Sequence, residues 1–280
     1  MSFTQPLEHV NANFDAQRDA IVFEDVVLSF EDKPVLDGIS FRLSRGETKA
    51  IFGIAGTGKS TILKLALGLV KPDSGRIYVL GEEVTAMKEE QLFDLRRKLG
   101  MVFQESALFD SLTVEDNVAF RLIEEHVPYE ELHQRVLEVL RFVELEHTVN
   151  LFPSELSGGM RRRVAIARAI ITQPEVLLYD SPTGGLDPVT STTIIELLVK
   201  QRDVYKTSAL LVTHRLQDAF VMATHTFNSK TNHMEQVPEG QHRDLNTNFL
   251  VLREGKIIFS GNASELVYSQ DEYIKEYLSQ

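Results

Sequence analysis

Residues 48–70, TKAIFGIAGTGKSTILKLALGLV, carry the pattern that most strongly indicates the fold. It begins with a short apolar run typical of a buried strand, continues through a glycine-rich segment, and ends with apolar residues at helical spacing. The octet GIAGTGKS at 53–60 matches the pattern G-x-x-x-x-G-K-[ST], in which backbone N–H groups turn toward phosphate oxygens. A strand, a phosphate loop and a helix in this order predict an α/β protein that binds a nucleotide.

The loop and the first helical turn are expected to hold the nucleotide. A helix N-terminus attracts phosphate through its unpaired N–H groups and its dipole. We expect Lys59 to reach the β and γ phosphates and the Ser60 hydroxyl to bind Mg²⁺. The alternative, a glycine-rich turn that matches by chance, does not explain the flanking strand and helix. The predicted set is Gly53, Ile54, Ala55, Gly56, Thr57, Gly58, Lys59, Ser60 and Thr61.

A second candidate ligand follows the apolar run VLLY at 176–179. This run and SALLVT at 208–213 flank a helix-like segment, which is the pattern of a βαβ unit and hence of a parallel sheet. Asp180 stands at the carboxyl end of its strand, where a carboxylate holds magnesium in phosphate-loop proteins. The alternative is an aspartate that only caps the strand.

The rest of the chain is divided by its composition. Residues 1–20 are polar without a clear period and are expected as an N-terminal extension, followed by one domain over 21–280. Residues 21–43 have the pattern of an antiparallel hairpin. Helix formers dominate a helical subdomain at about 89–160, and a polar surface insertion is expected at about 228–248.

Composition excludes several classes of protein. The 280 residues carry a formal net charge of −12, which argues against a nucleic-acid binder. The absence of cysteine excludes disulfides and cysteine-ligated zinc. No signal peptide or membrane span is apparent, so we expect a cytoplasmic protein whose membrane role depends on a partner.

The segment LSGGM at 156–160, followed by RRRVAIARAI, is more specific than the other motifs. Ser157, Gly158 and Gly159 present a hydroxyl and bare amides at a helix start, although a simple capped helix has the same pattern. With this segment, the chain resembles the ATP-binding cassette (ABC) ATPases, whose signature is usually LSGGQ. The other marks of that family occur in the right order across almost the whole chain.

The resemblance implies roles for further residues. Phe30 resembles the aromatic that stacks on adenine, Gln104 the magnesium and coupling glutamine, and Asp187 the aspartate at the dimer contact. His214 resembles the switch histidine near the γ phosphate. The family geometry implies a dimer in which the phosphate loop of one subunit meets Ser157 to Gly159 of the other across ATP and Mg²⁺.

Each of these residues has an alternative without a function. Phe30 could be a core side chain, Gln104 a solvated one, and His214 a hydrogen-bonded histidine at a strand end. The basic run Arg161 to Arg163 is expected as a solvated first helical turn rather than a nucleic-acid site.

The sequence departs from the family at Ser181. Most relatives place a glutamate there, which orients or deprotonates the attacking water, and serine is a poor base near neutral pH. Three explanations are open: slow hydrolysis sustained by His214 and electrostatics, which we favour; help from a nearby carboxylate such as Glu105; or a subunit that switches on ATP binding with negligible turnover.

Met160, ESALFDSLTVEDNVAF at 105–120 and the ending at 263–280 resemble the ATPases of mammalian-cell-entry type lipid transporters, which include the maintenance-of-lipid-asymmetry system. The resemblance implies a motor subunit on the inner face of the cell membrane. Its partners would be a second copy, an integral-membrane permease and a lipid-binding substrate protein. The motor of another ABC importer or exporter is the alternative.

Overall fold

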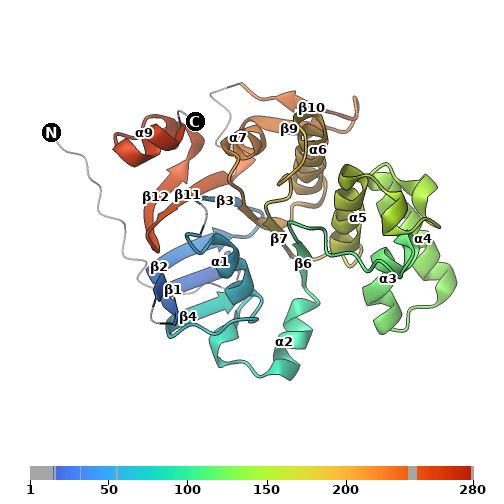
Figure 1. The fold of residues 1–280 in the computed structure, drawn as a ribbon, viewed down its shortest axis with the longest axis horizontal. Helices are drawn as coiled ribbons and strands as arrows, with labels where there is room; N and C mark the ends of the chain where they lie inside the picture. The colour runs from blue at the N-terminus through green and yellow to red at the C-terminus, as the bar shows by residue number, and fades with distance from the viewer. Residues whose placement is uncertain (1–14, 16, 32, 55, 239–244, 279–280) are drawn as a thin grey trace.

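A computed structural model describes residues 15, 17–31, 33–54, 56–238 and 245–278. Two sheets and a group of helices make up the fold (Figure 1). The expected α/β class is confirmed: a mainly parallel sheet forms the core, an antiparallel sheet forms the N-terminal part, and helices are inserted between the strands.

The core sheet has six strands in the order β12-β11-β3-β8-β7-β6. Its strands are β3 (Thr48–Phe52), β6 (Leu99–Val102), β7 (Val176–Asp180), β8 (Ser208–Val212), β11 (Thr247–Arg253) and β12 (Lys256–Asn262). All neighbours pair in parallel except β11 and β12, which form an antiparallel pair at one edge. The central strands β3, β7 and β8 are mostly apolar and almost entirely buried, as parallel strands covered on both faces should be.

The antiparallel sheet has the order β2-β1-β4-β5. Its strands are β1 (Asp19–Phe30), β2 (Lys33–Ser44), β4 (Ser74–Val79) and β5 (Glu82–Glu83). The expected hairpin at 21–43 is therefore confirmed as the β1–β2 pair. A further two-stranded hairpin joins β9 (His225–Asn228) and β10 (His233–Gln236).

The helices cover both faces of the core sheet and form a separate group at one end (Figure 1). That group contains α3, α4 and α5, while α1 lies near the N-terminal sheet. The helices are α1 (Lys59–Ala66), α2 (Glu89–Arg96), α3 (Val114–Glu124), α4 (Tyr129–Phe142), α5 (Gly158–Ile170), α6 (Pro188–Tyr205), α7 (Leu216–Thr224), α8 (Ala263–Val267) and α9 (Glu272–Leu278).

Alternate residues of the central strands enter two different apolar cores. In β3, Ala50 and Phe52 join the core under the helices, and Ile51 joins the core beneath the N-terminal sheet. The same alternation holds for Leu211 and Leu210 of β8. Because side chains on a strand point to opposite faces in turn, burial on both sides holds the central strands rigidly in register.

Some expected boundaries differ from the observed elements. The range 89–160 contains β6, which belongs to the core sheet because its four residues pair with β7. Strand β1 already begins at Asp19, whose carboxylate pairs with Arg42 at 2.5 Å, while residues 1–14 and 16 of the expected extension lie outside the described residues. The expected insertion at 228–248 overlaps the β9–β10 hairpin, and its residues 239–244 lie outside the described residues.

In the part of the chain that the structure describes, no helix is both long enough and apolar enough to cross a bilayer.

Candidate functional site

Four predicted site segments follow neighbouring parallel strands at the same edge of the core sheet. Gly53 follows β3, His214 closely follows β8, Asp180 ends β7, and Gln104 comes two residues after β6. The register pairs Ile51 with Val212 and Val212 with Asp180, so these strands end at one level. The carboxyl edge of a parallel sheet is where such proteins bind nucleotides.

The phosphate loop keeps a backbone shape that depends on glycine. Gly53 has φ of +150°, and a Cβ built there would lie 2.5 Å from the carbonyl oxygen of Leu252. The Lys59 ammonium donates to the Gly53 and Ile54 carbonyls at 2.7 Å each. To bind a phosphate oxygen, Lys59 must therefore exchange these acceptors. Ala55, which was also predicted here, lies outside the described residues.

The candidate magnesium ligands Ser60 and Asp180 lie in contact. The Ser60 hydroxyl donates to Oδ1 of Asp180 at 2.9 Å, although the two residues are 120 positions apart in sequence. Burial lowers the pKa of Lys59, and the nearby Asp180 carboxylate opposes this shift. A hydroxyl and a carboxylate beside the phosphate loop fit Mg²⁺, which prefers oxygen ligands and, when bound, neutralises charge on the phosphates.

Phe30 ends β1 beside the phosphate loop, and its side chain is 49% exposed. The strand that pairs with β1 lies against the loop, since a Cβ at Gly58 would be 2.9 Å from Cγ1 of Val35. The alternative of a core side chain is wrong because Phe30 is exposed. An exposed aromatic ring beside a phosphate loop is available for stacking on a base.

The signature residues begin α5 as a capped helix. Ser157 is the N-cap and accepts from the Met160 amide at 3.2 Å. A Cβ at Gly159 would lie 2.4 Å from Cγ2 of Thr190, so glycine allows the starts of α5 and α6 to approach closely. Ser157 and Gly158 are exposed, and the contacts that they make among the described residues are within this region rather than with the phosphate loop of the same chain.

Ser181 is fixed mainly by its backbone. Its amide donates to the Val212 carbonyl at 2.8 Å, and its own carbonyl accepts from Gly184 at 2.9 Å. The backbone has φ of +46°, an uncommon conformation for a non-glycine residue, and the residue is only 8% exposed. Among the described residues, the Ser181 hydroxyl has no hydrogen-bond partner that would raise its basicity.

Gln104 and His214 both expose their side chains. Gln104 lies close to Gly184, where a Cβ would be 3.5 Å from its Cγ, and the solvated-side-chain alternative stays open. His214 makes no side-chain hydrogen bond among the described residues, so the hydrogen-bonded alternative is wrong. Its carbonyl oxygen accepts from the Tyr277 hydroxyl at 3.4 Å.

Asp187, the expected dimer contact, caps α6 through the amides of Val189 and Thr190.

Sequence reasoning missed Arg162. The basic run was expected to be solvated, but Arg162 is 5% exposed and donates to the carbonyls of Phe103, Ser181 and Gly184 at 3.1 to 3.4 Å. Burial lowers its pKa, and the Glu105 carboxylate opposes the shift. The sequence did contain a pattern that indicates this burial, because Arg162 shares a helix face with the buried Ala165 and Ile166.

Arg168, also on α5, supports the segment after Gln104. Its guanidinium donates to the carbonyls of Ser106 and Ala107 at 2.8 and 2.6 Å. Both residues have positive φ, 63° and 47°, and burial lowers the pKa of Arg168. Because two consecutive non-glycine residues in this conformation are strained, the segment depends on these bonds to keep its shape.

A buried carboxylate on α7 was also missed. Asp218 is 5% exposed, accepts a hydrogen bond from the Thr183 hydroxyl, and lies 3.6 Å from Nε of Arg215. Burial raises its pKa, while Thr183, Arg215 and His214 oppose the shift. Asp218 thus joins the helix after His214 to the segment after Ser181.

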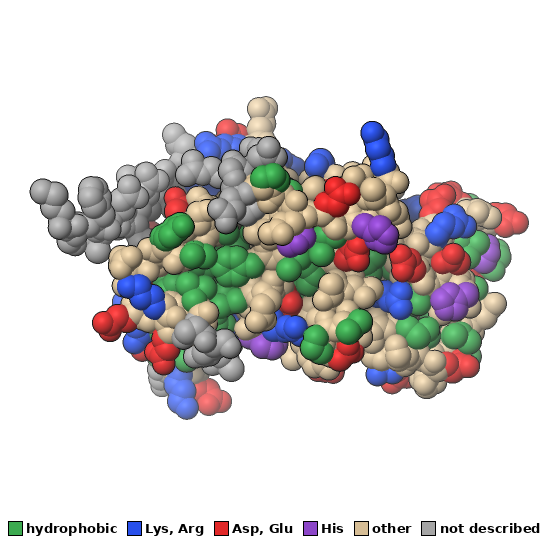
Figure 2. Space-filling view, turned by 90° about the horizontal axis from the view of Figure 1, so that it is seen from above, with side chains coloured by type: hydrophobic (Ala, Val, Ile, Leu, Met, Phe, Trp, Pro, Cys, Tyr) green, Lys and Arg blue, Asp and Glu red, His purple; other side chains and the backbone are tan. Residues whose placement is uncertain are grey.

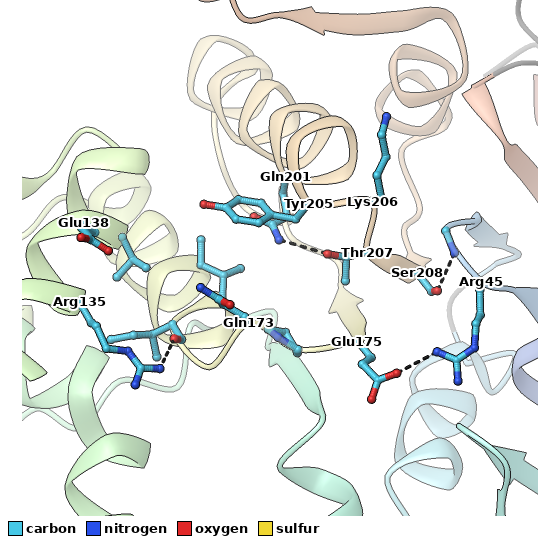
Figure 3. Close-up of a pocket in the computed structure, with 15 residues that line it drawn as sticks. Arg45, Arg135, Glu138, Gln173, Glu175, Gln201, Tyr205, Lys206, Thr207 and Ser208 are labelled. Atoms are coloured by element: carbon cyan, nitrogen blue, oxygen red, sulfur yellow. Dashed lines mark hydrogen bonds and ion pairs between the residues drawn. The ribbon is translucent and has the colours of Figure 1, made fainter. Parts of the chain in front are cut away.

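A cavity of about 520 Å³ lies away from this site (Figure 3). Its lining comes from α4, from the ends of α5 and α6, and from residues at or just before the starts of β3, β7 and β8, so it lies at the amino edge of the sheet. No residue of the predicted site lines it. Its labelled residues are Arg45, Arg135, Glu138, Gln173, Glu175, Gln201, Tyr205, Lys206, Thr207 and Ser208.

The family model described as ABC transporter matches residues 36–184, more than half of the 280-residue chain. The chain belongs to the ABC transporter family. This ABC ATPase is 38% identical to the protein TRIGALACTOSYLDIACYLGLYCEROL 3, chloroplastic, of Arabidopsis thaliana, over 90% of the chain and 71% of the relative. It is 31% identical to the intermembrane phospholipid transport system ATP-binding protein MlaF of Haemophilus influenzae, over 88% and 85%.

Other relatives of the ABC ATPase carry a different name. The methionine import ATP-binding protein MetN of Carboxydothermus hydrogenoformans is 39% identical over 70% of the chain. The chain spans only 59% of that relative's length. A solved structure of the ATP-binding cassette MJ0796, a dimer in a post-hydrolysis state bound to ADP and Pi, is also similar, with a TM-score of 0.72 and 29% sequence identity. The match covers 86% of this chain and 98% of that chain.

Family membership gives the chemistry of the chain. It is an ATPase of the ABC type, and its ligands are ATP and Mg²⁺. The expected cofactors and enzyme class are therefore confirmed, and so is the resemblance on which they rested.

Proposed function

We propose that this ABC ATPase is the motor subunit of a transporter for phospholipid or another hydrophobic cargo. The share of this chain that each relative covers supports this cargo. The phospholipid-transport relative matches 88% of the chain, whereas the methionine import relatives match 74% or less. The phospholipid relative therefore shares more of this chain's length.

ATP and Mg²⁺ lie, in this proposal, between two copies of the chain. The contact between Ser60 and Asp180 beside Lys59 carries the argument, because it assembles one half of a site. The exposed start of α5 supplies the other half to the partner copy. The nucleotide ligands are Phe30, Gly53 to Thr61, Ser157, Gly158 and Gly159, the magnesium ligands are Ser60, Gln104 and Asp180, and His214 acts near the γ phosphate.

Hydrolysis is proposed to be slow because Ser181 replaces a carboxylate. His214 and the charge-stabilising groups of the site sustain the reaction, since electrostatic stabilisation is often the largest catalytic contribution. Glu105 is the less favoured helper. It is exposed, and its charge acts on the Arg162 guanidinium, where it opposes the lowering of the pKa.

An exposed apolar surface on α2, α3 and the segment between β6 and α3 suits a membrane permease. We define the α2–α3 surface as Phe93, Phe103, Phe109, Phe120 and Ile123, each at least 37% exposed. The rings of Phe109 and Phe120 lie 4.8 Å apart, and two arginines lie over Phe93. Exposed aromatic and aliphatic side chains of this kind fit a partner helix that presents apolar residues.

The remaining partners follow from the same proposal. The permease holds the chain on the inner face of the cell membrane, and a lipid-binding substrate protein delivers or receives the cargo. The net charge of −12 supports partners other than nucleic acid.

The test is ATP-driven transfer of a fluorescent phospholipid between vesicles containing the chain and its permease. Wild type is expected to hydrolyse ATP faster than Lys59→Ala and to move the lipid. If wild type with its permease hydrolyses ATP no faster than Lys59→Ala, the motor proposal is wrong. Phe120→Ser should weaken stimulation by the permease, whereas Phe152→Ser, at an exposed position outside the α2–α3 surface, serves as control.

Two other functions remain candidates, each with its own observation. The identity to methionine import proteins, up to 41%, favours an importer of a small polar cargo. Stimulation of ATP hydrolysis by methionine rather than by phospholipid would support it. Ser181 favours a switch that responds to ATP binding, in which the complex changes shape with ATP although turnover equals that of Lys59→Ala.

A further inference from the structure

The last helix, α9, is held on the molecule by packing. Ile274 is 2% exposed in the core under the helices, and the Arg253 guanidinium lies 4.9 Å from the centre of the Tyr273 ring. A helix of seven residues is not stable alone, so these contacts determine where α9 lies. Figure 2 shows hydrophobic side chains gathered in the half of this face where Figure 1 places α9.

One side chain of α9 reaches the ATP end of the sheet. The Tyr277 ring meets the Phe52 ring edge-on, with centroids 6.5 Å apart at 60°. Its hydroxyl donates to the His214 carbonyl oxygen at 3.4 Å. Phe52 ends β3 and directly precedes the phosphate loop, so Tyr277 contacts the end of β3 and the segment that follows the neighbouring strand β8.

The phenol of Tyr277 keeps its proton under ordinary conditions. Burial raises its pKa and Tyr273 adds to the shift, while a hydrogen bond with the Gly53 backbone acts the other way. A neutral phenol is a hydrogen-bond donor, as the contact with His214 requires.

We propose that Tyr277 is a positioning residue of the ATP site, fixing the backbone that presents His214 relative to the start of the phosphate loop. The inference rests on the proposed roles of His214 and of Gly53 to Ser60. The His214 side chain is exposed and has no hydrogen bond of its own among the described residues, so the backbone is what fixes the place from which the imidazole extends. Tyr277 acts on this backbone from a helix that the ATPase motifs do not include.

The matched pair of variants is Tyr277→Phe and Tyr268→Phe. Both remove one phenolic hydroxyl from the C-terminal segment, but Tyr268 is 79% exposed. In the full chain, Tyr277→Phe is expected to lower kcat by about two- to ten-fold, the range for one neutral hydrogen bond. The Kd for a fluorescent ATP analogue with Mg²⁺ should change less than about two-fold on the same scale. Tyr268→Phe should match wild type.

A purely structural role for the ring predicts another result. Because phenylalanine keeps the ring against Phe52, kcat would then equal that of wild type, and this outcome overturns the proposal. A change in the Kd alone, with kcat unchanged, also overturns it. Tyr277→Ala removes the ring as well and should lower kcat further than Tyr277→Phe.

Amide hydrogen exchange separates this proposal from the proposed function. Tyr277→Phe is expected to speed exchange in peptides that contain residues 213–216, with Tyr268→Phe unchanged. If wild type hydrolyses ATP no faster than Lys59→Ala, the motor role fails, and exchange then decides the inference about Tyr277. Unchanged exchange in Tyr277→Phe would overturn it in that case.

Discussion

Arg162 donates a 3.1 Å hydrogen bond to the carbonyl oxygen of Phe103, the residue before Gln104. The two residues are 59 positions apart, and the same guanidinium reaches the carbonyls of Ser181 and Gly184. One buried side chain on α5 thus fastens the segment that carries Gln104 to the segment that follows Asp180. A displacement of α5 would therefore move both segments at once.

Replacing this guanidinium should destabilise the chain. Arg162→Lys leaves buried carbonyls without partners, because an ammonium cannot reproduce the planar fork of donors. We expect a loss of about 1–3 kcal/mol in the free energy of unfolding. Chemical denaturation measures it, with Arg141→Lys as the control at an exposed position on α4. Equal stability of the two variants would show that the buried bonds contribute nothing.

Because Ser60 and Asp180 lie in contact as candidate magnesium ligands, removing the Ser60 hydroxyl should weaken magnesium binding. Ser60→Ala removes one oxygen ligand and leaves the carboxylate in place. The Mg²⁺ concentration that supports half-maximal ATP binding should rise by at least about ten-fold, as for other losses around metal sites. Titration of Mg²⁺ with a fluorescent ATP analogue measures this shift. Ser229→Ala, at an exposed position in the β9–β10 turn, is the control, and a shift shared by both variants would refute the assignment.

Restoring a carboxylate at position 181 should accelerate hydrolysis. General-base assistance typically contributes about 10² to 10⁴ in rate, so Ser181→Glu is expected to raise kcat within that range. Ser181→Gln has nearly the same size but no base and should stay near wild type. Steady-state ATPase assays with the permease present compare the three proteins. Equal rates for Glu and Gln would mean that the water is activated elsewhere.

Asp218 predicts a pH-dependent difference in stability. Its folded-state pKa is raised above the ordinary value of 3.8, chiefly by burial. Between 3.8 and that raised pKa, the folded chain binds a proton that the unfolded chain lacks, so wild type loses stability as pH rises through this window. Because asparagine does not titrate, the stability of Asp218→Asn should not fall through this pH window for this reason.

The measurement is Tm at pH 4 and pH 7 for wild type and Asp218→Asn. The Tm of the variant relative to wild type is expected to be more favourable at pH 7 than at pH 4. Asp110→Asn, at an exposed position, is the matched control. A relative Tm that does not change with pH would contradict the assignment.

The residues that could be predicted from sequence are those whose roles follow from local patterns. Lys59 and Ser60 belong to a single loop between a strand and a helix, and Asp180 follows an apolar strand. Parallel pairing then brings them to one edge without further information. The contact at 2.9 Å between Ser60 and Asp180 is the direct outcome.

Residues whose roles depend on distant contacts could not be predicted in the same way. Tyr277 and His214 are 63 positions apart, and no local pattern relates them. Strand β6 was assigned to the helical subdomain because its four residues follow a helix closely, and only its pairing with β7 reveals it. The burial of Arg162 could have been predicted from the helical spacing of the apolar residues around it, but a run of three arginines normally indicates exposure.

The 520 Å³ cavity at the amino edge lies where α4 faces the end of α6. Its width would therefore change if the group of α3, α4 and α5 turned against the sheet. The chain contains no cysteine, so thiols introduced as Glu138→Cys and Tyr205→Cys would be its only ones. Spin labels at these two positions would report the distance between α4 and the end of α6 during ATP binding and hydrolysis, from a place that lies outside the nucleotide site.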